Sequence, residues 1–365
     1  MDDTEGTSDA TSTSATKGAP DTKGAPDTTG ILDEALQRLH ASGPERLGRL
    51  TNHAPMAVEA LAARGQARAV HRWLDLYAPK LEEFPAPVEP VTDGNWRAAL
   101  GDPRRAADWI AYFGRETEAR PWRDVLAEWW PRLLPGLYGG AAHPAIRVGH
   151  AVRTLEEGEE GVAAGPRLAE LAHGLGYWAA RHHPLAGVAV LPGADSAARA
   201  LDAVPPIANR KDGGFPTRLG RVEGLPAWAA AVTDPDEARR RLTELVRAAT
   251  HRYATHGHGE ATMLVHAATA PNAVLRALPA LPRDLWAPSL RAAWAASAAI
   301  TAMYAPDEAV AYVAPGAFAA EEVFERALAH GDEHVIKLTD TALDVGDGQA
   351  LAAALRAVEL SVPLA

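Results

Sequence analysis

Proline divides this chain into pieces of helical length. From Ile31 onward, the sequence between the prolines is rich in Ala, Leu, Arg and Glu and has few runs of β-branched residues. Those residue types favour helices, and proline punctuates helices because it lacks a backbone N–H. The pattern predicts an all-α fold. The only strand-like run, residues 187–191, is too short to found a sheet.

The same punctuation predicts one large helical domain over residues 31–365, built of roughly twelve helices. A final helix at 347–360 is expected to close the fold. Residues 204–226, rich in Gly and Pro, are expected to form a long irregular connection that serves either as a lid or as a linker. The expected helices are 33–40, 55–76, 104–118, 122–134, 147–156, 166–182, 236–255, 260–268, 272–277, 286–304, 319–330 and 332–343.

Residues 1–30 have a different composition and are predicted to form a disordered, low-complexity tail. They are polar, and the six-residue unit at 16–21 repeats at 22–27. This start has no apolar segment typical of a secretion signal, and no later run of about 18 apolar residues predicts a membrane span. A cytoplasmic protein without membrane contact is therefore expected.

Charge and missing residue types exclude several functions. The formal net charge is −11, and no compact basic stripe indicates nucleic-acid binding. The chain has no cysteine, which excludes disulfides, thiolate nucleophiles, Fe–S clusters and cysteine-bound zinc. It also lacks the glycine-rich dinucleotide and P-loop motifs, the serine nucleophile elbow and the zinc-protease HExxH motif.

Four of the fourteen histidines have unusual surroundings. His53 and His143 stand two residues and one residue, respectively, before a proline that opens a predicted helix, whereas His266 and His334 lie in apolar helical stretches. Each alone is explained equally well as a core histidine, but four together favour a shared metal. For eight of the others we expect solvated, capping or helix-end roles: His40, His71, His173, His182, His183, His251, His256 and His258.

Lys337 lies three residues after His334, so both side chains project from one helix face. Its apolar neighbours predict burial, which is costly for an ammonium group and lowers its pKa. One interpretation is an ion pair with Asp340, Glu333 or another carboxylate. The other is a neutral amine that adds carbon dioxide to form a carbamate, an anionic oxygen ligand. Imidazoles with one such anion suit Fe(II), and other divalent transition metals are alternatives.

Four short motifs resemble those of the questin oxidase-like family in order and spacing. They are Asn52-His53, Gly140-x-x-His143-Pro-x-Ile, Val265-His266-Ala-x-Thr269 and Asp332-x-His334-x-x-Lys337. The resemblance extends from about residue 31 to 345. It implies a helical fold and oxidative opening of anthraquinone-type rings with dioxygen. Fungal members are described as Baeyer–Villiger oxidases, and one relative as a non-haem iron dioxygenase with four histidines and a carboxylated lysine.

Carried over, the resemblance implies metal ligation by the four histidines and Lys337, with a small aromatic substrate and NADPH as a candidate reductant. It also implies a histidine at position 147, where this chain has Arg147, followed by His150 three residues later. We predict these two as catalytic residues, with Arg147 binding a carboxylate or phenolate. Three alternatives stay open: an NADPH-dependent Baeyer–Villiger-type oxidase without bound flavin, a carbamate-bridged metallohydrolase, and a helical ligand carrier or biosynthetic partner without activity.

Overall fold

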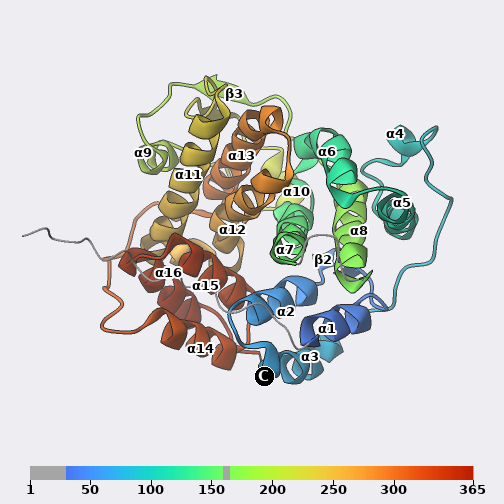
Figure 1. The fold of residues 1–365 in the computed structure, drawn as a ribbon. Coiled ribbons are helices and arrows are strands. Elements are labelled where there is room, and N and C mark those ends of the chain that lie inside the picture. Colours follow the sequence, from blue (N-terminus) through green and yellow to red (C-terminus); the bar gives the residue numbers. More distant parts are fainter. Residues whose placement is uncertain (1–29, 159–164, 365) are drawn as a thin grey trace, which may run out of the picture.

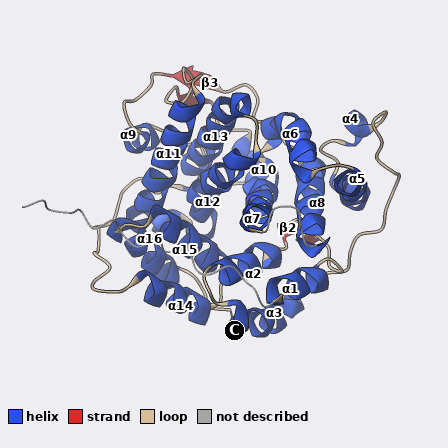
Figure 2. Ribbon diagram, in the orientation of Figure 1, coloured by secondary structure: helices blue, strands red, loops and turns tan. Residues whose placement is uncertain are grey.

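The computed structural model describes residues 30–158 and 165–364, and helices account for nearly all of its regular structure (Figures 1 and 2). The tail predicted at 1–30 lies almost wholly outside the described residues. The α-helices are α1 Ile31–Leu39, α2 Ala54–Ala63, α3 Val70–Tyr77, α4 Trp96–Ala99, α5 Ala106–Ala119, α6 Trp122–Leu133, α7 His143–Glu157, α8 Gly165–Ala180, α9 Ala197–Asp202, α10 Phe215–Leu219, α11 Pro235–His256, α12 Ala261–Ala277, α13 Trp286–Tyr304, α14 Ala320–His330, α15 Glu333–Val345 and α16 Gly348–Leu360.

Two very small sheets accompany these helices. Strands β1 (Glu45–Arg46) and β2 (Leu50–Thr51) pair antiparallel, and β3 (Ala189–Leu191) pairs in parallel with β4 (Gly224–Pro226). The all-α prediction is therefore confirmed, and the short strand-like run forms only the edge strand β3. No helix in the described ranges has the length and apolar character needed to cross a membrane.

Helix α7 begins at His143, four residues before the predicted start at 147, and two further stretches are divided into helices differently from the prediction. The helix expected at 55–76 is two helices, because Gly65 has a left-handed φ of 74° and ends α2. The N–H of Gln66 then donates to the carbonyl of Leu61 at 2.8 Å, as in a Schellman cap. Conversely, the two helices expected at 260–268 and 272–277 are one, since α12 continues through Pro271. Tertiary packing along α12 outweighs the hydrogen bond that Pro271 cannot make.

The segment at 204–226 is also more ordered than predicted. It contains α10 and β4, and its Leu219, Val222 and Leu225 are buried in the main core. Trp228, just beyond it, packs its ring at 5.4 Å from Trp294 on α13. These contacts attach the segment to the helical body.

Four helices form a closed ring at the centre of the fold. Helix α2 packs on α7, α7 on α12, α12 on α15, and α15 on α2 (Figure 1). Close approach of α7 to α12 requires Gly149, because an added Cβ would lie only 2.5 Å from the Cβ of Ala273. Helix α8 covers α7 on one side and is itself covered by α5, while α11 and α13 cover α12 on the other side.

Candidate metal centre

Four buried histidines, one from each helix of the central ring, meet in the interior of the protein. Their ligand nitrogen atoms all lie within 4.8 Å of one another. His53 caps the N-terminus of α2, His143 is the first residue of α7, His266 lies within α12, and His334 is the second residue of α15. The structure thus brings together the four histidines that the sequence predicts as ligands.

His143 occupies the middle of the cluster. Its Nε2 lies 2.7 Å from Nε2 of His53 and 2.7 Å from Nε2 of His266. The Nδ1–H of His143 donates to the carbonyl of Gly140 at 2.5 Å, and that of His266 donates to Met263 at 3.1 Å. These bonds leave the Nε2 lone pairs of both rings facing each other. Lone pairs so close repel unless a cation lies between them, so this donor set fits a metal ion.

A strained turn fixes the orientation of His143. Gly140, Ala141 and Ala142 all have left-handed backbone angles, with φ values of 56°, 55° and 66°. For each alanine this conformation costs about 1 kcal/mol relative to a right-handed one. The turn aims the Gly140 carbonyl at the His143 ring. It therefore selects the tautomer whose Nε2 faces the cluster.

The two remaining histidines are held by their helix starts. Asp332 caps α15 by accepting hydrogen bonds from the N–H groups of His334 and Val335 at 3.0 and 3.1 Å. The N–H of His53 donates to the hydroxyl of Tyr77 at 3.1 Å. The Nδ1 atom of His53 is buried without a hydrogen-bond partner.

Glu333 is the acceptor nearest to that nitrogen, with Oε1 at 3.8 Å from Nδ1 of His53. Its other oxygen accepts from Nζ of Lys80 at 3.1 Å. Sequence reasoning placed Glu333 near the site only as a partner for Lys337. The actual arrangement resembles the carboxylates that orient metal-binding histidines from behind.

Burial lowers the pKa of all four histidines, and the neighbouring Lys337 lowers each further. For His266 the pKa falls to about 3. The rings are therefore neutral near pH 7, which is the form that binds metal ions.

Lys337 is fully buried, and its Nζ has no hydrogen-bond partner. Burial lowers its pKa to about 7, against the raising effect of Glu333 and Asp332. Within the described residues no carboxylate lies within ion-pair distance of Nζ, and Asp340 instead binds three arginines. The ion-pair interpretation of Lys337 is therefore wrong, whereas a neutral amine beside the histidines fits.

A family model for questin oxidase-like proteins matches residues 50–341. The chain belongs to the questin oxidase-like family. The matched range includes the four histidines and Lys337, and the family name indicates an oxidase-type or oxygenase-type enzyme. A search of curated proteins finds no match to the chain.

The two residues predicted as catalytic lie outside the histidine cluster of this questin oxidase-like chain. Arg147 is buried and forms two hydrogen bonds with Glu170 of α8. His150 is buried and bonds to Glu59 of α2, in a separate group of charged side chains. Their catalytic role stays a prediction, but the structure shows that each already has an ionic partner.

Among the other histidines, His173 departs from the expected solvated role, because it is buried and stacks on His40 at a ring distance of 4.4 Å. Several tryptophans also lie in the hydrophobic core. Trp129 packs among aromatic rings of α4 and α5, and Trp130 against Trp178. Core packing is the usual fate of tryptophan.

Proposed function

We propose that this questin oxidase-like protein is a metal-dependent oxygenase, with iron as the metal. Its substrate would be an aromatic polyketide, either a quinone or a hydroquinone, whose ring is cleaved between two carbons. Family membership supports the oxygenase class. The observation that carries the metal dependence is the set of four converging, neutral histidines with two Nε2 atoms 2.7 Å from that of His143.

The histidines and Lys337 would hold the metal, and a ferrous ion bound there would supply dioxygen activation. The protein's own part is to keep the four rings neutral and oriented through Gly140, Met263 and the helix starts. Lys337 would complete the set as a carbamate: its neutral amine forms a bond to the carbon of carbon dioxide and releases one proton. The product supplies the negative charge that four imidazoles lack.

A cavity of about 110 Å³ borders the turn that precedes His143, and we propose it as the substrate approach. Its lining includes Gly139, Gly140, His182, His183 and Phe215. Phe215 begins α10, within the segment 204–226 that the sequence suggested as a lid. The place of Phe215 at this cavity supports the interpretation of the segment as a lid over its interpretation as a simple linker.

The metallohydrolase alternative is less well supported. A carbamate-bridged hydrolytic site usually joins two metals and needs several free carboxylates. The carboxylates of Glu59, Asp340 and Asp344 are instead bound to arginines. One metal per chain is therefore expected.

The test begins with protein purified without chelator. We expect close to one transition metal per chain by elemental analysis, and oxygen uptake in the presence of a hydroquinone. Replacing His53, His143, His266 or His334 by Ala should each remove most of the metal, because an incomplete shell binds weakly. His71→Ala, a half-exposed histidine, is the control and should retain it. Equal metal content in all five variants would contradict the ligand assignment.

A further inference from the structure

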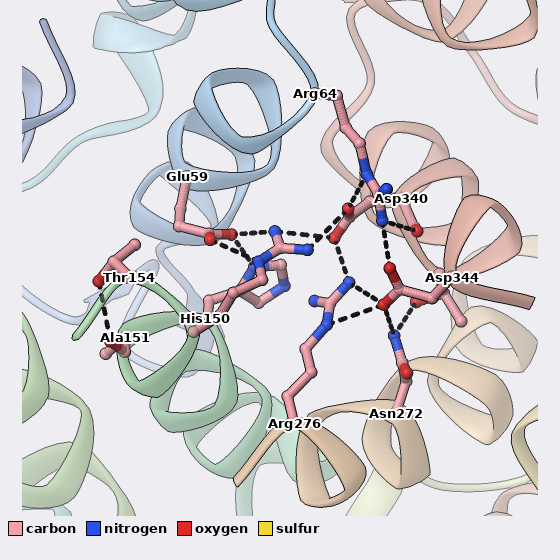
Figure 3. Close-up of polar contacts among 11 residues, drawn as sticks. Glu59, Arg64, His150, Ala151, Thr154, Asn272, Arg276, Asp340 and Asp344 are labelled. Atoms are coloured by element: carbon pink, nitrogen blue, oxygen red, sulfur yellow. Dashed lines mark hydrogen bonds and ion pairs between the residues drawn. The ribbon is translucent and has the colours of Figure 1, made fainter. Parts of the chain in front are cut away.

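A second buried cluster of polar side chains lies in the same four central helices as the histidines (Figure 3). It consists of hydrogen-bonded and ion-paired groups that are buried or half-buried, with Asp344 at the solvent-exposed edge. We call it the ionic network, and its members are Glu59, Arg64, His150, Arg153, Asn272, Arg276, Asp340 and Asp344.

Asp340 is the centre of the ionic network. Its side chain is completely buried, and its oxygens accept hydrogen bonds from Nε of Arg64 at 2.7 Å, Nη1 of Arg153 at 3.0 Å and Nη2 of Arg276 at 2.7 Å. Arg64 directly follows the last residue of α2, Arg153 belongs to α7 and Arg276 belongs to α12. A single carboxylate of α15 thus binds the other three helices of the ring.

Glu59 and Asp344 complete the connections. Glu59 accepts from Nε of Arg153 at 2.7 Å and also contacts His150. Asp344 accepts from Nε of Arg276 and from the amide of Asn272, both at 2.9 Å. The guanidinium of Arg153 bridges Glu59 and Asp340, so the position that a second metal ion would take between them is already filled by a cation.

The spacing along the chain relates this network to the histidines. In every helix, one member follows the histidine by six or seven residues and another by ten or eleven. At 1.5 Å per residue these steps correspond to about 10 and 16 Å along a helix axis. The four series are His53, Glu59 and Arg64; His143, His150 and Arg153; His266, Asn272 and Arg276; His334, Asp340 and Asp344.

This regularity means that the four helices run in the same direction, from the histidines at one level to the ionic network at another. The network has three guanidinium groups and three carboxylates, and burial lowers the pKa of His150, which keeps that ring neutral. Because its charges balance, it exerts little net field on the histidines. Any influence on them must act through helix position.

We infer that the ionic network is a positioning device for the histidine cluster. By binding all four helices, Asp340 and its partners fix how far each helix advances toward the cluster, and so where each imidazole lies. Buried ion pairs are better suited to setting such a register than to adding stability, because desolvation offsets most of their attraction. The inference rests on the proposed metal centre only in the first of the two tests below, which measures metal binding.

The first test measures Co²⁺ binding by absorbance in the full chain. Asp340→Asn keeps the size of the side chain but removes the charge that binds three arginines. The dissociation constant for Co²⁺ should rise measurably, but by less than the roughly 10- to 100-fold found when a group bonded directly to a metal ligand is lost. The visible spectrum of the bound ion should also change. Asp344→Asn, at a partly exposed position, should show the same effect more weakly, and it serves if Asp340→Asn does not fold.

Asp108→Asn is the matched control. Asp108 is equally buried and bound to an arginine, but it lies on α5, which carries none of the four histidines. It should lower stability while leaving Co²⁺ affinity and spectrum unchanged. Wild-type affinity and spectrum in the folded Asp340 and Asp344 variants would overturn the inference.

The second test needs no metal, and therefore separates this inference from the proposed function. Hydrogen exchange in the metal-free protein should accelerate in Asp344→Asn at the histidine-bearing starts of α2, α7 and α15, but not in Asp108→Asn. If wild-type protein binds no Co²⁺, the metal proposal fails and this exchange pattern alone decides. Faster exchange limited to the end of α15 would show that the network has only a local structural role.

Discussion

Arg147 binds Glu170 through two parallel hydrogen bonds, from Nε to Oε1 at 2.5 Å and from Nη2 to Oε2 at 2.7 Å. Both side chains are buried, and the ion pair keeps the pKa of Glu170 well below its usual range. Arg147→Met would leave this buried carboxylate with only the imidazole of His40, 3.0 Å away, as a side-chain partner. We expect the free energy of unfolding in urea to fall by about 3–5 kcal/mol.

The double variant Arg147→Met, Glu170→Met provides the control for that change. It removes both charges, so much of the lost stability should return. Unchanged stability in Arg147→Met, together with a raised KM for substrate, would instead support the sequence-based prediction that Arg147 binds the substrate.

Lys337 should act as a precursor of a metal ligand. Lys337→Met removes a buried amine that has no hydrogen-bond partner, so the metal-free protein should gain about 1 kcal/mol of stability while metal content falls sharply. Lys337→Arg should also lose metal, because a guanidinium group stays charged and forms no carbamate. Elemental analysis and thermal unfolding measure both effects.

Bicarbonate or a short carboxylic acid added to Lys337→Ala should restore part of the metal and activity, since either supplies an oxygen anion in the space left by the side chain. Full metal and activity in Lys337→Arg would show that the residue is a structural cation and that no carbamate is needed.

Glu333 should strengthen metal binding without contacting the metal. Its Oε1 lies 3.8 Å from the otherwise unpartnered Nδ1 of His53, and its charge favours the tautomer with a proton on that nitrogen. Glu333→Gln should therefore raise the dissociation constant for Co²⁺ about 10- to 100-fold. Glu82→Gln, which changes an exposed carboxylate, is the matched control. Equal affinities would exclude an orienting role for Glu333.

Acid should weaken the fold through the ionic network. Arg153 and His150 lower the pKa of Glu59 from 4.5 to about 2, even though burial alone would raise it. Between these two pH values the unfolded chain binds the proton and the folded chain does not, so stability falls as the pH decreases. The loss from this group is at most about 3 kcal/mol. Urea unfolding of Glu59→Gln should be measured between about pH 5 and about pH 2, an interval that spans those two pKa values. Its free energy of unfolding should decline less steeply than that of the wild type.

Much of the candidate site was visible in the sequence because its signals are local. A histidine that lies one or two residues before a helix-opening proline, such as His143 or His53, can be recognised from the sequence without knowledge of its partners. The same holds for Lys337, whose apolar neighbours on one helix predict burial. Local signals also predicted the helical class. The helix boundaries at Gly65 and Pro271 were predicted wrongly, because tertiary packing decides whether a helix ends at such a residue or continues through it.

The ionic partners were not predictable in this way. Glu170 lies 23 residues from Arg147, and Asp340 lies 276 residues from Arg64, so no helical spacing connects them. Each such residue looks like an ordinary charge on a solvated helix face. One signal was nevertheless present: polar residues recur six or seven and ten or eleven positions after each of the four histidines. That repeat would have indicated a second level of contacts among the same helices.

The four central helices begin at residues 54, 143, 261 and 333, and His334 is the last of the four histidines to leave the ribosome during synthesis. A nascent polypeptide therefore displays at most three of the imidazoles until the start of α15 has emerged. Products truncated before α15 would lack one imidazole and would not retain a tightly bound ion. Tight metal binding would therefore show that all four central helices have assembled.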